Sequence, residues 1–109
     1  MLVFVVFMFG VVSAETEIGS CQNLTVESEV YILNQSITDI VGTCFNITAS
    51  NITFDGNGFT ITGDGGQYDA GIATPADSDL VNITIKNFGS IINVTYGIYL
   101  DRVNNSLIE

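Results

Sequence analysis

The sequence predicts an all-β protein folded as a parallel β-helix, a solenoid of about three coils, and three observations support this prediction. Apolar residues alternate with polar ones at a period of two, the intervening segments are rich in glycine and asparagine, and the strands recur at nearly constant spacing. Repeats of about 26 residues made of short strands cannot bury a face alone, so they must stack. The expected repeat region covers residues 15–109.

The composition is that of a folded chain and excludes two classes of partner. The 109 residues are 47% hydrophobic and 13% charged, the reverse of a disordered chain. The net charge of -10 arises because Lys86 and Arg102 are the only basic residues. Since phosphate groups are bound by clustered Lys and Arg, we expect no nucleic-acid partner and no attraction to an anionic membrane surface.

The first fourteen residues are typical of a secretory signal peptide. Residues 2–12 are apolar apart from Gly10, and the small residues Ser13 and Ala14 follow. This run is too short to span a bilayer, which takes about 20 apolar residues, although it lacks the preceding Lys or Arg of most signals. Cleavage after Ala14 predicts a protein that is secreted, periplasmic or at the cell surface, with no membrane span.

Export gives a meaning to the only two cysteines, Cys21 and Cys44, because an oxidising compartment would join them. They are 23 residues apart, close to one coil. Stacked strands lie about 4.8 Å apart, and a disulfide accepts Cα separations of about 4.4 to 6.8 Å. The bridge would pin the first coil, residues 21–42, onto the second. Two unrelated buried thiols are the alternative; a zinc site lacks the histidines that would complete it.

Three segments are predicted as half-buried strands, because β-branched and apolar residues alternate with polar ones over residues 51–55, 59–62 and 81–86. Glycine-rich turns separate them at residues 55–58 and 63–66, where Gly and Asn supply the positive φ angles of tight corners. The chain is therefore expected to be short strands joined by sharp corners.

Two offsets relate the strands to one another. Residues 51–54 match residues 82–85 at an offset of 31, and the same offset carries Ile61 onto Ile92. Residues 44–47, 70–73 and 96–99 follow one another at an offset of 26. We expect an inserted loop of five residues at 75–79 to reconcile the two offsets.

The run Cys-Phe-Asn-Ile-Thr-Ala-Ser-Asn-Ile-Thr-Phe-Asp-Gly-Asn-Gly-Phe-Thr-Ile at residues 44–61, with Cys21 upstream, resembles the start of secreted right-handed parallel β-helix repeat proteins. These include NosD-type periplasmic proteins and archaeal surface proteins. Residues 97–100 and 104–108 are similar to the later repeats of that family. The resemblance implies a right-handed solenoid with a carbohydrate-associated or cell-surface role, which is an analogy at the level of the fold.

The acidic residues do not form a recognisable catalytic set. Glycoside hydrolysis needs two carboxylates at fixed separation, and the related lyases use calcium held by an Asp cluster with a base. Two candidate acids lie at Gly-rich corners, where short side chains bond their own backbone. Lys86, which the offset of 31 places over one of these acids, and Arg102 are isolated bases. The candidate acids are Asp55, Asp64, Asp69, Asp77 and Asp79.

We therefore expect no catalytic residue, cofactor or metal in this segment. Copper would need His, Met or free Cys ligands, but the chain has no His, and its methionines lie in the predicted signal. Calcium at residues 55–58 or 64–66 has oxygen ligands available, yet neither run has the ligand spacing of a known calcium loop.

Seven of the ten asparagines begin an Asn-x-Ser/Thr sequon, and two interpretations remain open. The sequons are acceptor sites of a glycosylated surface protein, or they record a corner Asn followed by an inward Ile and an outward Thr. The sequon asparagines are Asn23, Asn34, Asn46, Asn51, Asn82, Asn93 and Asn104.

Residues 104–108 are predicted to be a strand in an unfinished coil, so we expect an N-terminal piece of a longer protein or self-association through an open C-terminal coil. Tyr96, Ile98, Leu107 and Ile108 should be exposed near that edge. The first functional hypothesis is a non-enzymatic secreted or cell-surface protein, structural or in contact with glycans or cell-envelope components. The alternative is the capping coils of a polysaccharide lyase or hydrolase whose catalytic coils lie beyond residue 109.

Overall fold

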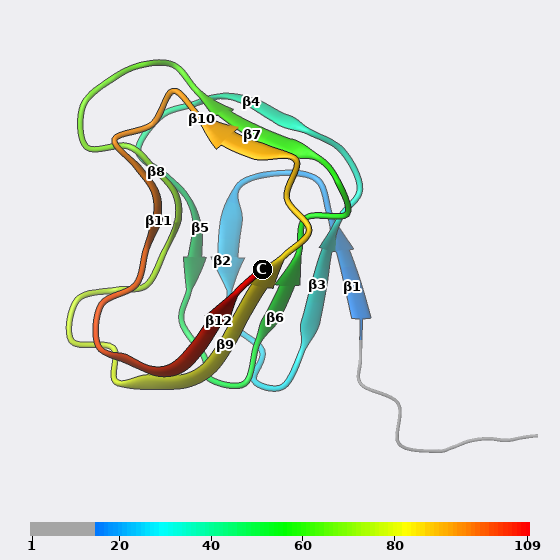
Figure 1. Ribbon diagram of the computed structural model, residues 1–109, viewed down its shortest axis with the longest axis vertical. Coiled ribbons are helices and arrows are strands. Elements are labelled where there is room, and N and C mark those ends of the chain that lie inside the picture. The colour runs from blue at the N-terminus through cyan, green and yellow to red at the C-terminus, as the bar shows by residue number, and fades with distance from the viewer. Residues whose placement is uncertain (1–14) are drawn as a thin grey trace, which may run out of the picture.

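The computed structural model describes residues 15–109, and the predicted signal peptide at residues 1–14 lies outside this range. The described chain forms twelve β-strands and no helix. All strand pairs are parallel, and the strands are divided among three sheets. Figure 1 shows these sheets on three sides of a common interior. The prediction of an all-β protein with stacked parallel strands is confirmed.

The three sheets are named here by their number of strands. The five-stranded sheet has the order β1 (Glu15–Ile18), β3 (Val30–Leu33), β6 (Thr53–Asp55), β9 (Leu80–Lys86) and β12 (Val103–Ile108). The four-stranded sheet has the order β2 (Gln22–Leu24), β5 (Thr43–Ile47), β8 (Ala70–Ala73) and β11 (Tyr96–Tyr99). The three-stranded sheet has the order β4 (Ile37–Ile40), β7 (Thr60–Gly63) and β10 (Ser90–Ile92). From β3 onward the chain visits the five-, three- and four-stranded sheets in rotation.

One hydrophobic core receives side chains from all three sheets. Phe45 and Phe54 join the four- and five-stranded sheets edge to face, with ring centroids 4.7 Å apart, and Phe88 continues the stack at 5.1 Å from Phe54. Burying one such side chain contributes about 1.5–3 kcal/mol to stability. The large side chains that are fully buried are Leu24, Leu33, Phe45, Ile47, Ile52, Phe54, Ile61, Ile72, Ile83 and Ile85.

The offset of 31 is correct in the five-stranded sheet and wrong in the three-stranded sheet. Asp55 on β6 pairs with Lys86 on β9, as predicted. Ile61, however, pairs with Ile91 and not with Ile92. The connection at residues 87–89 is one residue shorter than its counterpart at residues 56–59, so the strand that follows is shifted by one position. This shift leaves Ile92 49% exposed and packs Ile91 against the core.

The offset of 26 also holds for only one of its two steps. Tyr96 pairs with Ala70 as predicted, but Ala70 pairs with Thr43 and not with Cys44. The observed register places Phe45 beside Ile72, and both are fully buried. A slip of one residue would turn side chains to the opposite face of the strand. Core packing therefore decides the register here.

Two long connections, at residues 64–69 and 74–79, flank strand β8 where the sequence predicted one insertion at 75–79. We call one circuit of the chain through the three sheets a pass. Residues 41–42 are enough to join β4 to β5 in the preceding pass, and residues 100–102 are enough to join β11 to β12 in the following pass. Strand β8 is thus the only strand in the described chain with a long connection on each side.

Cys21 and Cys44 form the predicted disulfide, with their Cα atoms 4.5 Å apart. Gln22 pairs with Phe45 across β2 and β5, so the two cysteines stand side by side where this pairing begins. The bridge therefore links neighbouring strands of the four-stranded sheet, as the one-coil spacing predicted.

Strands β10, β11 and β12 each lie at an edge of their sheets. Tyr96, Leu107 and Ile108 are about half exposed there, as expected, with exposed fractions of 47%, 52% and 55%. Ile98 differs from the expectation, because it packs against the core on β11. The apolar surface at this edge is accordingly smaller than the sequence indicated.

Candidate functional site

A shallow groove of about 280 Å³ runs over the four-stranded sheet, on the face that turns away from the core. Alternation along β5 explains the outward position of Asn46, which lies between the buried Phe45 and Ile47, whereas Thr43 is exposed at the first position of the strand. Strands β5, β8 and β11 and the long connections beside β8 supply the lining. The lining residues are Thr43, Asn46, Tyr68, Ala70, Ala73, Thr74, Tyr96 and Tyr99.

The parallel register brings the lining residues together in two rows. Ala70 pairs with Thr43 on one side and Tyr96 on the other. The second row places Ala73 between Asn46 and Tyr99. The alanine side chains are short, so β8 forms a low floor between larger neighbours. This arrangement of small residues beneath larger ones makes the hollow.

Tyrosine side chains form the walls of the groove. The rings of Tyr96 and Tyr99 lie edge to face, with centroids 5.1 Å apart, and both residues are 47% exposed. Tyr68 comes from the connection at residues 64–69 and is 80% exposed. Exposed tyrosines gathered in one hollow are typical of binding surfaces, because each ring offers apolar area together with a hydroxyl group.

Tyr68 adopts a backbone conformation that is unfavourable for a bulky side chain. Its φ is 63°, in the left-handed region. The next pass of the chain stabilises this conformation, because Thr95 Oγ1 accepts a hydrogen bond from Tyr68 N at 2.9 Å. Strained residues of this kind collect at functional sites. Tyr68 is therefore held on the rim of the groove at an energetic cost.

The groove carries no carboxylate and no basic side chain among its lining residues, so its only ionisable groups are tyrosine hydroxyls. The rest of the molecule is strongly acidic, with a net charge of -10. A ligand of the groove therefore meets amide, hydroxyl and aromatic groups within a negative long-range potential. This environment disfavours an anionic ligand.

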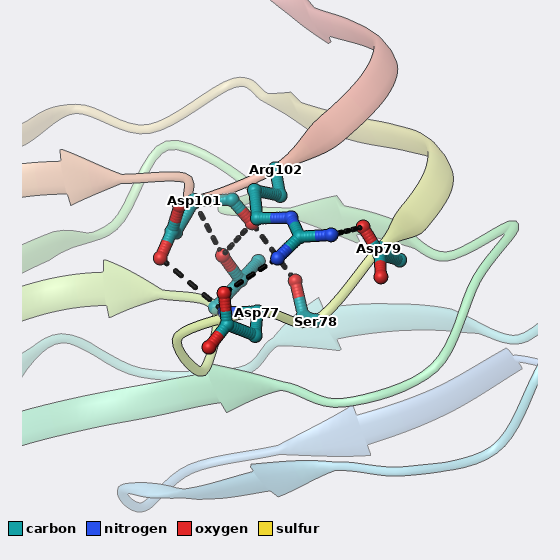
Figure 2. A network of polar contacts seen from close by, with 6 residues as sticks. Asp77, Ser78, Asp79, Asp101 and Arg102 are labelled. Carbon is teal, nitrogen blue, oxygen red and sulfur yellow. Dashed lines mark hydrogen bonds and ion pairs between the residues drawn. The ribbon is translucent and has the colours of Figure 1, made fainter.

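The second long connection is fixed by a cluster of charges at its tip, which Figure 2 shows from close by. Arg102 Nη1 donates to Asp77 Oδ1 at 2.5 Å, and Arg102 Nη2 contacts Asp79 Oδ1 at 2.8 Å. The hydrogen bond that Arg102 donates to Asp77, and the negative charge of Asp79, raise the pKa of Arg102 above its ordinary value. Two predicted candidate acids thus share one guanidinium, whose single positive charge balances one of their two negative charges.

The same connection is tied to the groove through Thr74. Asp101 N donates to Thr74 Oγ1 at 2.7 Å, and Ser78 Oγ donates to the carbonyl oxygen of Asp101 at 2.9 Å (Figure 2). Thr74 is buried and lines one end of the groove. The polar network therefore holds residues 74–79 against the corner at Asp101 and shapes that end of the groove.

The corner acids behave as turn residues. Asp55 Oδ1 accepts hydrogen bonds from Asn57 N at 2.8 Å and Asn87 Nδ2 at 3.3 Å. Within residues 15–109 the ion pairs are those of Arg102, so Asp55 and Lys86 are neighbours in register without a salt bridge. The hydrogen bonds of the Asp55 carboxylate are thus made to corner amides and not to Lys86.

The sequon asparagines fall into three groups. Asn46 lines the groove, and Asn23, Asn34, Asn93 and Asn104 are exposed. The third group is engaged in side-chain hydrogen bonds at one corner, described next. The seven sequons are therefore not equivalent in the folded chain.

Asn51, Asn82 and Asn105 occupy equivalent places on successive passes, and we call them the asparagine corner. Asn82 Nδ2 donates to Asn51 Oδ1 at 2.8 Å, and Asn51 Nδ2 donates to Glu27 Oε2 at 3.2 Å. All three adopt left-handed φ angles of 59° to 62°, which asparagine tolerates better than most residues. The interpretation of sequons as corner residues fits this group.

The tyrosines were not predicted as site residues. Residues 96–99 were expected to match earlier repeats, and Tyr96 and Ile98 to be exposed at an edge, although the tyrosines there replace the alanines of residues 70–73. A change from small to aromatic residues at equivalent positions of a repeat was the available signal. Tyr68 gave no such signal, because its approach to the groove depends on the path of a long connection.

No group of three or more His, Cys, Asp or Glu side chains suited to a metal ion occurs in the part of the chain that the structure describes. Over the same residues, no helix is long and apolar enough to cross a membrane. No family model, curated protein or solved structure matches this chain.

Proposed function

We propose that the chain is a right-handed parallel β-helix and works as a non-enzymatic, glycan-contacting module of an exported protein. The rotation of the strands through three parallel sheets supports the solenoid. Right-handed crossovers predominate strongly between parallel strands, which supports the handedness. A disulfide suits an oxidising compartment, such as the periplasm or the cell surface.

The observation that carries the glycan assignment is the tyrosine-walled groove with its alanine floor. A sugar ring has faces of C–H groups and a rim of hydroxyls, so it can stack on aromatic rings while bonding to amide and hydroxyl groups. Tyr96 and Tyr99 offer the rings, and Asn46 and Thr43 offer the polar partners. Sites for small polar ligands combine an aromatic lining with a few polar groups in this way.

The charge distribution selects neutral glycans within this class. None of the lining side chains is basic, and the net charge of -10 repels acidic polysaccharides. Arg102 is committed to Asp77 and Asp79, away from the lining. An uncharged oligosaccharide meets no such opposition.

The test is binding of neutral and acidic polysaccharides by affinity electrophoresis and titration calorimetry. Tyr99→Ala and Tyr96→Ala should each weaken binding of a neutral glycan about tenfold, since a stacked ring contributes roughly 1–1.5 kcal/mol. Ile92→Ala is the matched control, because Ile92 is similarly exposed but lies on the three-stranded sheet.

Three outcomes would contradict the proposal in whole or in part. Failure of all neutral polysaccharides to bind removes the glycan assignment. Equal binding by the wild-type chain and both tyrosine variants removes the groove as the site. Preference for an acidic polysaccharide would reject the selection by charge and retain only the groove.

A further inference from the structure

The connection at residues 64–69 contains a carboxylate whose burial the groove does not explain. Asp69 is 3% exposed, and its Oδ1 accepts a hydrogen bond from Gly42 N at 2.7 Å. Its Oδ2 is buried and has no hydrogen-bond partner among residues 15–109. Burying an ionised carboxylate oxygen without a partner is strongly unfavourable. Asp69 Oδ2 therefore calls for a donor or a counter-charge beyond the hydrogen bonds of the described residues.

A second carboxylate lies on the other side of Gly66. A Cβ atom placed on Gly66 would be 3.0 Å from Asp64 Oδ1 and 3.2 Å from Asp69 Oδ2, so these two oxygens lie close together on the same side of Gly66. Gly66 N donates to Asp64 Oδ1 at 2.8 Å. This hydrogen bond, followed by the interaction with Asp69, holds the pKa of Asp64 below its ordinary value. Asp64 is also exposed, and an exposed aspartate is ionised at neutral pH.

The basic side chains of the chain are committed elsewhere. Arg102 is bound to Asp77 and Asp79, and Lys86 lies on β9 of the five-stranded sheet. The sequence contains no third Lys or Arg and no His. A cation that balances the charge of Asp64 and Asp69 would therefore come from solution.

We propose that Asp64 and Asp69 bind a divalent cation of the calcium class beside Gly66. Calcium takes carboxylate, carbonyl and water oxygens in irregular geometry, which suits a loop with two carboxylates. So few charged ligands place the affinity in the range of extracellular modules, with a Kd of about 0.1–1 mM. The negative potential of the whole chain adds to the attraction.

The cation would also fix the wall of the groove. Tyr68 lies next to Asp69 in the chain and reaches the groove from the same connection. Holding both ends of residues 64–69 would restrict the position of Tyr68. This last consequence rests on the proposed glycan function, whereas the cation site stands without it.

Titration of the oxidised chain with calcium chloride at pH 7.4, after treatment with a chelator and without any glycan, tests the site. We expect a Kd in the range given and a rise in Tm of about 3 °C or more at 10 mM calcium. Asp64→Asn and Asp69→Asn should each abolish both effects, and their amide oxygens can still accept the hydrogen bonds from Gly66 and Gly42. Asp39→Asn is the charge-matched control, because Asp39 is exposed and its φ of 56° suits Asn.

Calcium binding that survives in both variants, or no binding by the wild-type chain, overturns the proposal. A shared proton is the specific competitor. In that case the wild-type chain would lose thermal stability as pH rises from about 5 to 8 in chelator, calcium would not restore it, and Asp69→Asn would remove the pH dependence. Because no glycan is present, failure of the cation site leaves the glycan proposal to its own test.

Discussion

The asparagine corner and the two long connections share the left-handed backbone conformation, but their side chains make different contacts. Asn51 and Asn82 at the corner have φ angles of 60° and 59°, and Tyr68 and Asp77 in the long connections have angles of 63° and 58°. At the corner, Asn51 and Asn82 each donate a side-chain hydrogen bond to the preceding pass of the chain. In the long connections, the equivalent freedom directs side chains to Arg102 or to the groove. In the regular repeats, polar side chains therefore bond to one another between passes. In the long connections, side chains instead form the ion pairs and line the groove.

The largest loss of stability is expected when core volume is removed next to the asparagine corner, in the regular part of the fold. Ile83 follows Asn82 and is fully buried. Ile83→Ala should lower the free energy of unfolding by about 2–5 kcal/mol through lost burial and the cavity left behind. Chemical denaturation measures this, with Ile92→Ala as the control that should cost less than about 1 kcal/mol because Ile92 is half exposed.

Removal of the disulfide is the next largest perturbation of the regular region. Replacing Cys21 and Cys44 by Ser should lower stability by about 2–4 kcal/mol, since the unfolded chain regains the entropy of an open loop. Thermal unfolding of the double variant against the oxidised parent measures the loss. Peptides linked in a non-reduced digest establish the bridge itself, and two free thiols there would refute it.

The comparison is sharpened by one substitution on each side. Asn82→Ala should lower the free energy of unfolding by about 1–2 kcal/mol. The substitution removes the hydrogen bond to Asn51, and alanine tolerates the left-handed φ at this position less well than asparagine does. Asn82→Gly should recover part of this loss. Asp77→Asn in the long connection should cost less than about 1 kcal/mol, since its ion pair is exposed. Equal costs would erase the distinction between the two regions.

The smallest expected effect is a loss of stability at acidic pH through the carboxylate of Asp64. The Gly66 N–H holds the pKa of Asp64 below its ordinary value, so the stabilisation is present above the ordinary pKa and is lost as pH falls through the lowered one. In chelator, the wild-type chain should lose more stability than Asp64→Asn as pH falls below about 4. Parallel acid denaturation curves for the two chains would contradict this.

The fold was predictable because the buried residues of each strand can be recognised from a short stretch of sequence. Alternation around Phe54 and Ile61 identified strands, and one-coil spacing identified the bridge between Cys21 and Cys44. Register was less predictable, since a corner one residue shorter moved Ile91 into the place expected for Ile92. Corner length is decided by packing against the neighbouring pass, which local pattern does not report.

The candidate site was largely hidden from the sequence. The sequence does show small residues at 70 and 73 and tyrosines at 96 and 99, but only parallel pairing places them side by side. The ion pair between Arg102 and Asp77 joins residues 25 positions apart through the path of an inserted loop. Contacts that depend on long connections have no periodic signature, which explains why Arg102 was expected to be isolated.

The bridge between Cys21 and Cys44 has a consequence for how the chain assembles. Parallel pairing offers many alternative alignments to an unfolded chain, and a slip of one residue exchanges the inner and outer faces of a strand. The bridge is covalent, so in an oxidised chain it keeps the start of β2 beside the start of β5, close to the alignment of Gln22 with Phe45, even when other strands are unpaired. Reduction of the bridge would therefore reopen the choice of alignment between these two strands.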